Sequence, residues 1–455
     1  MQPLESQYVR DQVSRRGVRL NEKRTNPEGR YVLYWMQSTH RLHENWALRF
    51  AILQADRLNK PLLIHQGLDP TYEHANDRIH SFILHNAREL TARAAELGLT
   101  YRFVLRHRRD DDRRVVDQLA ADAAMVVTDL YPTAGIAERS RRFAERAPCR
   151  IVAVESFAII PSGIFEKEEY AARTIRPKLL PLLPHALQEV EDRPQRVPFP
   201  DAWLAGLAGT PLDLARCDIG SEVARCEIDH AVRPVDMVSG YTAARSRLNA
   251  FCADALATYG KRRADPNDEV GSSRLSPYLH FGQIPAAEVA RAALASGHGA
   301  QADAFIGELV VWRELALNFC LRNPRYATLD ALPAWVHKTM GEHAADPRDA
   351  TYSLAEFEGA ATHEPLWNAA QREIVASGLM HNVVRMLWGK HVIQWAPTYG
   401  DALRWLVHLN NKYGLDGRDP CSFAGIQWCF GKFDRPFYTR PVLGVIRTMS
   451  LKRAR

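Results

Sequence analysis

The stretch YVLYWMQSTHRLHENWALRFAILQADRLNKPLLIH, residues 31–65, decides the fold. Its first part, 31–36, is an apolar run typical of a buried strand, and 45–59 has the apolar spacing of an amphipathic helix. A second apolar run follows at 61–65. A strand, a helix and another strand in succession predict a parallel βαβ unit.

The same alternation continues to residue 154. A helix is expected over 82–98, another near 113–123 and a third before the last strand. The further predicted strands are 101–106, 124–130 and 150–155. Five strands with intervening helices predict an α/β domain with a Rossmann-like parallel sheet. Neither a glycine-rich dinucleotide fingerprint nor a P-loop follows any of these strands, so the sheet alone indicates no function.

The chain outside the sheet has a different character. Residues 1–28 form an N-terminal extension before the α/β domain, which we place at 29–160. Frequent prolines in 161–235 break any long element and predict an interdomain connector. Residues 236–455 have almost wholly helical apolar spacing and predict a second, all-α domain.

Composition narrows the class of protein. The 59 basic and 53 acidic residues leave a net charge of +6, which suits a polyanion partner without establishing one. Seven scattered cysteines without a CxxC pair argue against a disulfide framework or a thiolate zinc site. No run approaches the roughly 18 apolar residues of a membrane span, and the start lacks the apolar core of a signal peptide. With no targeting segment evident, the Ala/Arg-rich composition indicates a bacterial cytoplasm, and a monomer is the default expectation.

The first motif of the helical domain is SSRLSPYLHFGQI, 272–284. Ser276 followed by Pro277 predicts a helix start with a hydroxyl cap. Ser272 and Ser273 could place hydroxyl groups and free backbone N–H groups around a phosphate. The alternative is a capped helix that binds nothing.

The second motif is FIGELVVWRELALNF, 305–319. Glu308 and Trp312 are four residues apart and share a helix face. Glu308 is either paired with a buried arginine or is a carboxyl group whose pKa is raised by apolar surroundings, so that it donates a hydrogen bond.

The third motif is LWNAAQREIVASGLMHNVVRMLWGKHVIQW, 366–395, in which Gly378 is expected to separate two helices. Trp388 and Trp395 lie two helical turns apart on one face, roughly 10 Å along the axis. Trp367 lies on the preceding helix. The three indoles are either a bulky core or a relay of oxidisable rings, and spacing does not distinguish the two.

The fourth motif is LNNKYGLDGRDP, 409–420, where Asp416 and Asp419 flank Arg418. These residues form either a turn with local ion pairs or carboxylates that fix an arginine or accept from a bound ring. His363 and His381 are isolated histidines, for which capping or packing is expected rather than zinc ligation.

Together the motifs resemble those of the photolyase/cryptochrome superfamily, and within it most closely the class II cyclobutane pyrimidine dimer photolyases. SRLSPYLHFG is typical of the superfamily, whereas LWNAAQ and LNNKYGLDGRDP are similar to class II forms. The similarity extends from GRYVLYWMQSTHR (29–41) to VIRTMS (445–450). The sequence departs from the class II pattern at Gly307, Asn382-Val383, Leu387 and Cys421-Ser422.

The resemblance implies FAD in the helical domain, blue light as co-substrate, and ultraviolet-damaged DNA as substrate. Reduced, light-excited FAD would give an electron to a pyrimidine dimer, whose cyclobutane ring splits before the electron returns. The implied FAD contacts are Tyr259, Ser272, Ser273, Leu275, Ser276, Arg385, Asp416 and Asn410, with Asn410 near flavin N5.

The resemblance also implies roles in electron transfer and DNA binding. Trp388 would lie nearest the flavin and pass the electron hole to Trp367 and then to an exposed Trp395. Glu308 would bond the carbonyl oxygens of the dimer. Photolyases are among the enzymes that act on flipped bases. The residues implied at the flipped dimer or the DNA are Trp312, Trp428, Met386, Asn382, Arg435 and Arg447.

Two other functions remain as alternatives. A photoreceptor of the same fold would keep FAD and the relay without repair, but would not need Glu308, Trp312 and Trp428. Repair of (6-4) photoproducts predicts a pair of active-site histidines near 381–388, where only His381 is found. The sequence leaves open whether an antenna chromophore binds to the α/β domain.

Overall fold

The computed structural model describes residues 6–449, and the chain divides into two compact units. Unit 1 comprises Met1–Ile164, Leu183–Ser246 and Leu275–Val289. Unit 2 comprises Phe165–Leu182, Arg247–Arg274 and Ala290–Arg455. In the described range, 6–449, no helix is both long and apolar enough to span a bilayer.

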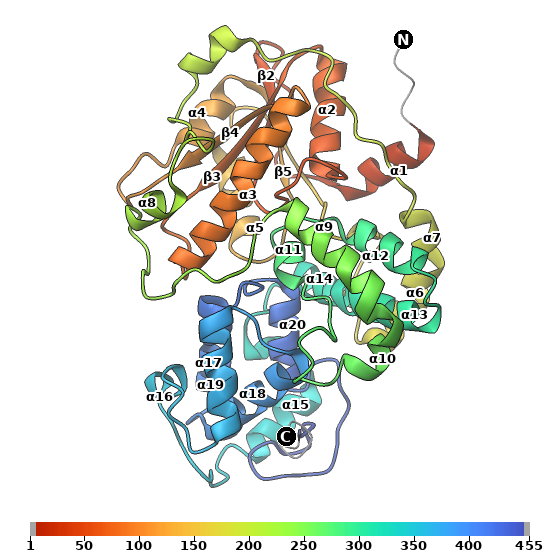
Figure 1. Cartoon of the computed structure of the whole chain (residues 1–455), viewed down its shortest axis with the longest axis vertical. Coiled ribbons are helices and arrows are strands. Elements are labelled where there is room, and N and C mark those ends of the chain that lie inside the picture. The colour runs from red at the N-terminus through yellow and green to blue at the C-terminus, as the bar shows by residue number, and fades with distance from the viewer. Residues whose placement is uncertain (1–5, 450–455) are drawn as a thin grey trace. The chain divides into compact units, whose positions relative to one another are not determined.

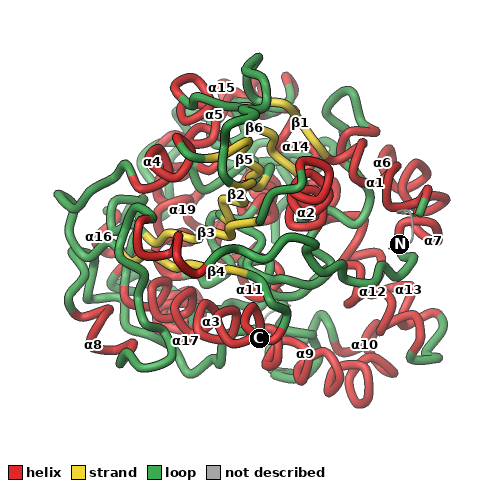
Figure 2. The backbone as a smooth tube through the Cα atoms, turned by 90° about the horizontal axis from the view of Figure 1, so that it is seen from above, coloured by secondary structure: helices red, strands yellow, loops and turns green. Residues whose placement is uncertain are grey.

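Unit 1 is built on one six-stranded sheet with the order β1-β6-β5-β2-β3-β4, which Figure 2 shows in yellow. The strands are β1 (Gly17–Arg19), β2 (Tyr31–Met36), β3 (Leu62–Leu68), β4 (Thr100–Leu105), β5 (Ala123–Asp129) and β6 (Arg150–Val154). The five strands β2 to β6 pair in parallel, which confirms the predicted α/β fold. The additional strand β1 pairs antiparallel with β6 and was not predicted, because its three residues carry no apolar run.

Both faces of the sheet are buried, as the apolar strand runs require. Val32 and Tyr34 of β2 pack with α2 on one face, whereas Tyr31 and Leu33 pack with α4 and α5 on the other. The helices beside the strands are α2 (Trp46–Leu58), α3 (Asp77–Glu96), α4 (Val115–Ala121) and α5 (Ile136–Arg146). Asn45 and Asn76 cap the N-termini of α2 and α3 through their side chains. The rest of unit 1 includes α1 (Gln7–Arg16), α11 (Ser276–His280) and most of α9 (Tyr241–Ala250).

The proline-rich stretch 161–235 has only short helices, as expected from its breakers. They are η1 (Ser162–Ile164), α6 (Ala172–Leu179), η2 (Leu180–Leu182), α7 (Leu183–Ala186), η3 (Asp201–Gly206) and α8 (Ile219–Ala224). Residues of this stretch belong to both units.

Unit 2 is almost wholly helical, as predicted (Figure 1). Its central helix α18 (Asn382–Trp395) packs against α17 (Pro365–Ser377), α19 (Tyr399–Tyr413) and α20 (Pro420–Cys429). Gly378 ends α17 with a φ of 73°, so the expected break between two helices is confirmed. Other helices of unit 2 include α10 (Tyr259–Arg262), the π-helical η6 (Gly307–Trp312), α14 (Arg313–Arg322) and α16 (Leu354–Glu358).

Candidate active site

Three indoles form a continuous row inside unit 2. The rings of Trp388 on α18 and Trp367 on α17 are nearly parallel, with centres 6.2 Å apart and planes at 9°. Trp395, at the end of α18, meets Trp367 edge-on with centres 6.4 Å apart. The spatial order is therefore Trp388, Trp367, Trp395.

The first two indoles of the row are held by hydrogen bonds. Trp388 Nε1 donates to Gln371 Oε1 at 3.0 Å, and Trp367 Nε1 donates to the carbonyl oxygen of Trp388 at 3.0 Å. Gln371 is fully buried and was missed by the sequence analysis. Its position four residues after Trp367 in LWNAAQ, on the same helix face, was the signal that could have identified it.

The third indole is not exposed. Trp395 is only 6% accessible, so the prediction of a surface indole is wrong. The rings of Tyr352, His363 and His391 lie 6.0, 4.9 and 4.6 Å from it, measured between ring centres. Tyr352 and His363 lie in the segment before α17, and His391 lies one turn earlier on α18. Together these three rings cover the indole.

An ion pair joins α18 to the loop that follows α19. Arg385 on α18 and Asp416, just after α19, approach to 3.0 Å, as the resemblance implied. Arg385 Nε is buried and makes no hydrogen bond within residues 6–449, whereas Asp416 Oδ1 is the oxygen 3.0 Å from Arg385 Nη2. Asn410 on α19 is 1% exposed and donates to Asn411 Oδ1 at 3.2 Å. Buried polar atoms without partners usually indicate an additional bound group.

Asp416 and Asp419 have separate structural tasks in the loop before α20. Asp416 pairs with Arg385, while Asp419 is the N-cap of α20 and accepts from the Cys421 backbone N–H at 2.7 Å. Arg418 itself adopts a φ of 66° and donates to the Asn411 carbonyl oxygen.

The serine motif is only partly as expected. Helix α11 begins at Ser276 with Pro277 next, but the cap residue is Leu275 and no side chain caps the helix. The prediction that the Ser276 hydroxyl group caps the helix is therefore wrong, because Ser276 is the first residue of the helix and not the residue before it. Ser272 and Ser273 are half-buried in the segment of unit 2 that ends at Arg274, and Tyr259 of that segment is buried.

Glu308 lies in the π-helical turn η6 and forms an ion pair with Arg263 at 2.6 Å. The two side chains are 35% and 40% exposed, so the alternative of an arginine partner is observed, with the partner accessible rather than buried. Arg263 was missed because it lies 45 residues earlier in the sequence. Four residues after Glu308, Trp312 stacks on Trp428 of α20, with ring centres 4.5 Å apart and planes at 24°.

The remaining predicted DNA contacts lie in two places. Met386 follows Arg385 on α18, and its Sδ is 3.9 Å from Cys429 Sγ on α20. Asn382 is exposed at the start of α18. The two arginines of the C-terminal segment, Arg435 and Arg447, are exposed, with guanidinium groups 5.8 and 6.0 Å from the ring of Phe437.

The isolated histidines have the structural tasks that were expected. His381 is the N-cap of α18, and its Nδ1 accepts from the Val383 N–H at 3.3 Å. His363 packs against Trp395. Across 6–449, no cluster of histidine, cysteine or carboxylate side chains has the arrangement of a metal site.

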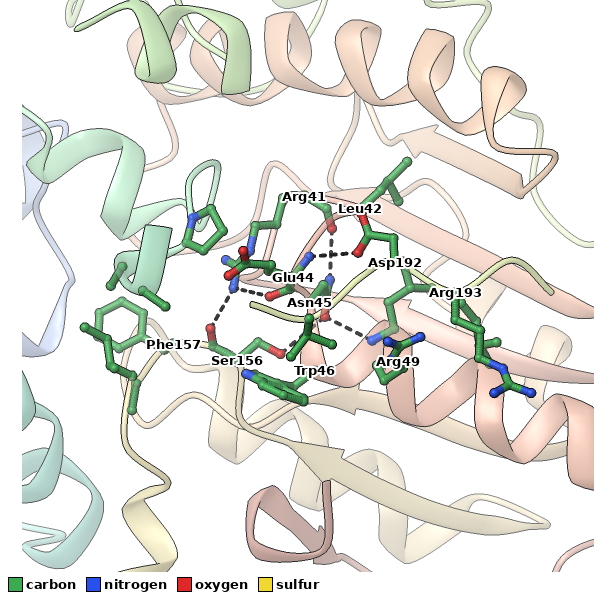
Figure 3. A pocket seen from close by; sticks show the side chains of 18 of the residues that line it. Arg41, Leu42, Glu44, Asn45, Trp46, Arg49, Ser156, Phe157, Asp192 and Arg193 are labelled. Atoms are coloured by element: carbon green, nitrogen blue, oxygen red, sulfur yellow. Dashed lines mark hydrogen bonds between the residues drawn. The ribbon is translucent and has the colours of Figure 1, made fainter. Parts of the chain in front are cut away.

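Unit 1 contains a small cavity of about 130 Å³ beside α2, shown in Figure 3. Its polar groups bond one another: Arg41 donates to the carbonyl oxygens of Glu44 and Ser156 at 3.1 and 2.8 Å. The Glu44 N–H donates to Asp192 Oδ1 at 3.1 Å, and Asn45 donates to the Arg41 carbonyl oxygen at 2.9 Å. Because these polar groups are bonded to one another, the cavity needs no ligand to satisfy them.

A larger cavity, of about 510 Å³, lies in unit 1 at the carboxyl ends of β3 and β4. Trp35, His65, Arg106 and Arg139 are among its lining residues. His65 is 2% exposed, and its Nδ1 has no hydrogen-bond partner in the described chain. Burial, and secondarily the charge of Arg102, lowers the pKa of His65 to about 3, so its ring is neutral. The carboxyl edge of a parallel sheet is where open α/β folds bind ligands.

Comparison with known proteins gives consistent results. A family model described as DNA photolyase matches residues 32–198. A deoxyribodipyrimidine photo-lyase of Methanothermobacter thermautotrophicus is 35% identical, with 95% of this chain and 93% of the relative aligned. One from Arabidopsis thaliana is 34% identical, covering 92% of this chain and 85% of the relative. The crystal structure of a class III photolyase from Agrobacterium tumefaciens shares the fold, with a TM-score of 0.67 and 19% identity over 90% and 82% of the two chains.

Proposed function

This chain belongs to the DNA photolyase family, and on that premise we propose that it repairs cyclobutane pyrimidine dimers in DNA with light, as a class II enzyme. The assignment to class II rests on LWNAAQ and LNNKYGLDGRDP, which the resemblance placed with that class. The observation that carries the repair activity is the stacked pair Trp312–Trp428 next to Glu308.

The pair supports dimer binding because of its chemistry. Two half-buried indoles, 4.5 Å apart, offer planar apolar faces of the kind that flipped bases stack against. Glu308 lies one turn from Trp312 and is partly accessible, so its carboxyl group can reach a polar edge of a stacked base. A protein that only senses light has no need of this combination.

The residues of unit 2 fit FAD. The unpartnered Nε of Arg385 offers a donor to the edge of a flavin ring, the paired Asp416 carboxylate offers an acceptor, and buried Asn410 offers a neutral amide. In unit 2 the serine hydroxyl groups at 272 and 273 suit the phosphates, while Tyr259 supplies apolar surface. Leu275 and Ser276, which the resemblance also implied, belong to unit 1. Bound FAD would supply the one-electron chemistry that no side chain can perform alone. The row Trp388, Trp367, Trp395 would conduct electrons to it.

The exposed arginines complete the proposed DNA surface. Arg435 and Arg447 lie around Phe437, which is 38% exposed, so this segment combines cationic groups with an aromatic ring. Such a combination suits DNA phosphates and unpaired bases. Met386 and Asn382 would contact the damaged strand from α18.

We also place an antenna chromophore, if the enzyme uses one, in the 510 Å³ cavity of unit 1. The buried, unpartnered Nδ1 of His65 could bond a polar atom of the chromophore, and Arg139 favours an anionic group, whereas Arg106 is paired with Asp69.

The experiment that tests this function is illumination of FAD-loaded protein, reduced by blue light and a thiol, with a dimer-containing oligonucleotide. Recovery of thymine absorbance is expected. Photoreduction without recovery would instead indicate a photoreceptor. The variant Glu308→Ala should keep FAD but lower the repair yield, and an unchanged yield would remove the role assigned to that carboxyl group.

A further inference from the structure

The outer end of the tryptophan row is a tyrosine and a histidine, not an indole in water. Trp395 is 6% exposed, whereas Tyr352 is half-buried and His363 is exposed. The ring centres of Tyr352 and Trp395 are 6.0 Å apart. This separation matches the 6.2 and 6.4 Å steps between the three indoles. The row therefore continues, ring to ring, from Trp395 to Tyr352.

Hydrogen bonds fix Tyr352 in this position. Its hydroxyl group lies 2.6 Å from His363 Nδ1, and the His363 backbone N–H donates to the hydroxyl oxygen at 2.9 Å. The Tyr352 backbone N–H donates to the carbonyl oxygen of Trp395 at 3.1 Å. With the ring proton of His363 on Nε2, the phenol donates to Nδ1, so a proton acceptor is in place.

The indoles inside the row have no such acceptor. Trp388 donates to the amide oxygen of Gln371 and Trp367 to a backbone carbonyl oxygen, and neither of these neutral groups takes up a proton near pH 7. Losing an electron therefore leaves a charged radical on either ring. Among the described residues of the row, Tyr352 is the one whose N–H or O–H group is hydrogen-bonded to a base. A phenol that loses its proton together with the electron is easier to oxidise than an indole that keeps its proton.

We propose that Tyr352 and His363 form a proton-coupled redox site that ends the tryptophan relay. The inference rests on the proposed function, because the primary oxidant is the light-excited oxidised flavin, acting through the three indoles. One electron passes from Tyr352 to the Trp395 radical cation, and the phenolic proton moves to His363 Nδ1. The products are a neutral tyrosyl radical, an imidazolium and a restored indole. A thiol then gives a hydrogen atom to the tyrosyl radical, which restores the phenol and leaves a thiyl radical, and His363 releases its proton to water.

Light-induced electron paramagnetic resonance on FAD-loaded full-length protein tests this inference. The wild-type protein should show a tyrosyl radical after a flash, which disappears in Tyr352→Phe and persists in Tyr438→Phe, a control whose ring is 89% exposed. In Tyr352→Phe the remaining signal should be a tryptophan radical that decays faster by charge recombination. A wild-type protein that photoreduces its flavin but leaves only a tryptophan radical would overturn the tyrosine assignment alone. Absence of both photoreduction and radicals would contradict the relay itself.

A second measurement tests the histidine. Removing the base in His363→Gln should lower the tyrosyl yield several-fold and abolish the solvent deuterium effect on the rate of its formation. The same comparison can be made on flavin-free protein, with a flash-generated ruthenium(III) polypyridyl complex as one-electron oxidant. A Tyr352 radical formed equally well in His363→Gln would overturn the proton transfer.

Discussion

Unit 2 uses the same side chain, tryptophan, in two groups with different surroundings. The row Trp388, Trp367, Trp395 is buried, with each ring at most 6% exposed and its first two N–H groups bonded. The pair Trp312–Trp428 is half-buried and stacked face to face. Enclosed, fixed rings suit electron transfer through the protein, whereas accessible faces suit a ligand that stacks. The surroundings of an indole, and not its identity, indicate its task.

The largest expected effect comes from breaking the row. Trp388→Phe should abolish reduction of bound FAD by blue light and a thiol, because it removes the oxidisable ring at the inner end of the row. The size and apolarity of the replacement should preserve the fold. Absorption spectroscopy under continuous illumination measures this. Photoreduction at the wild-type rate would mean that electrons reach the flavin by another route.

The second effect comes from breaking the pair. Trp312→Ala should weaken binding of dimer-containing DNA by roughly 1–3 kcal/mol, or about 5- to 150-fold, the usual contribution of stacking on one base. Undamaged DNA, held by phosphate contacts, should lose little affinity. Fluorescence anisotropy with labelled oligonucleotides gives both constants. Trp203→Ala in unit 1 serves as the control, and equal losses in both variants would argue against a dimer site at the pair.

A smaller effect concerns how the row is fixed. Gln371→Leu leaves the Trp388 N–H buried without an acceptor and should lower the free energy of unfolding by about 1–3 kcal/mol. In a Trp388→Phe background the same substitution should cost less, because no N–H remains. Urea unfolding of the four proteins of this double-mutant cycle measures the coupling. Additive losses would mean that the hydrogen bond contributes nothing.

The smallest effect concerns the link between the two groups. Lys390 on α18, the helix of Trp388, is 2% exposed and donates to the carbonyl oxygen of Cys429 on α20, the helix of Trp428. Burial lowers the pKa of Lys390 to about 8. The unfolded chain then binds more protons above this pKa, so stability rises with pH.

This single lysine should add roughly 1.4 kcal/mol to the free energy of unfolding between about pH 7 and about pH 9. Lys390→Met should remove that rise, whatever its effect at pH 7. Urea unfolding at both pH values tests it. An identical pH dependence in the two proteins would show that Lys390 is not desolvated as its contacts indicate.

The sequence was sufficient for much of this account. Apolar runs of five to seven residues predicted strands β2 to β6, because strands buried on both faces carry an unmistakable pattern. Strand β1 has no such pattern, since it is a short edge strand with exposed side chains. The break between two helices at Gly378 was also predicted, because glycine commonly ends a helix.

Contacts between segments that are distant in the chain could not be predicted from the sequence. The Arg263–Glu308 ion pair and the stacking of Trp312 on Trp428 join residues 45 and 116 positions apart, and no local rule selects such partners. The exposure of Trp395 was misjudged because Tyr352 and His363, which cover it, belong to a segment before α17 that is distant in the sequence. The motifs therefore predicted which residues belong to the site, whereas their contacts depend on tertiary packing.

The central claim is that the two tryptophan groups have separable tasks, and one crossed experiment tests it most directly. Trp388→Phe and Trp312→Ala are each loaded with FAD, and each is assayed for photoreduction and, after chemical reduction, for dimer repair. We predict that Trp388→Phe loses photoreduction but repairs dimers once reduced, whereas Trp312→Ala photoreduces normally but repairs poorly. Loss of both activities in both variants, with FAD still bound, would contradict the account.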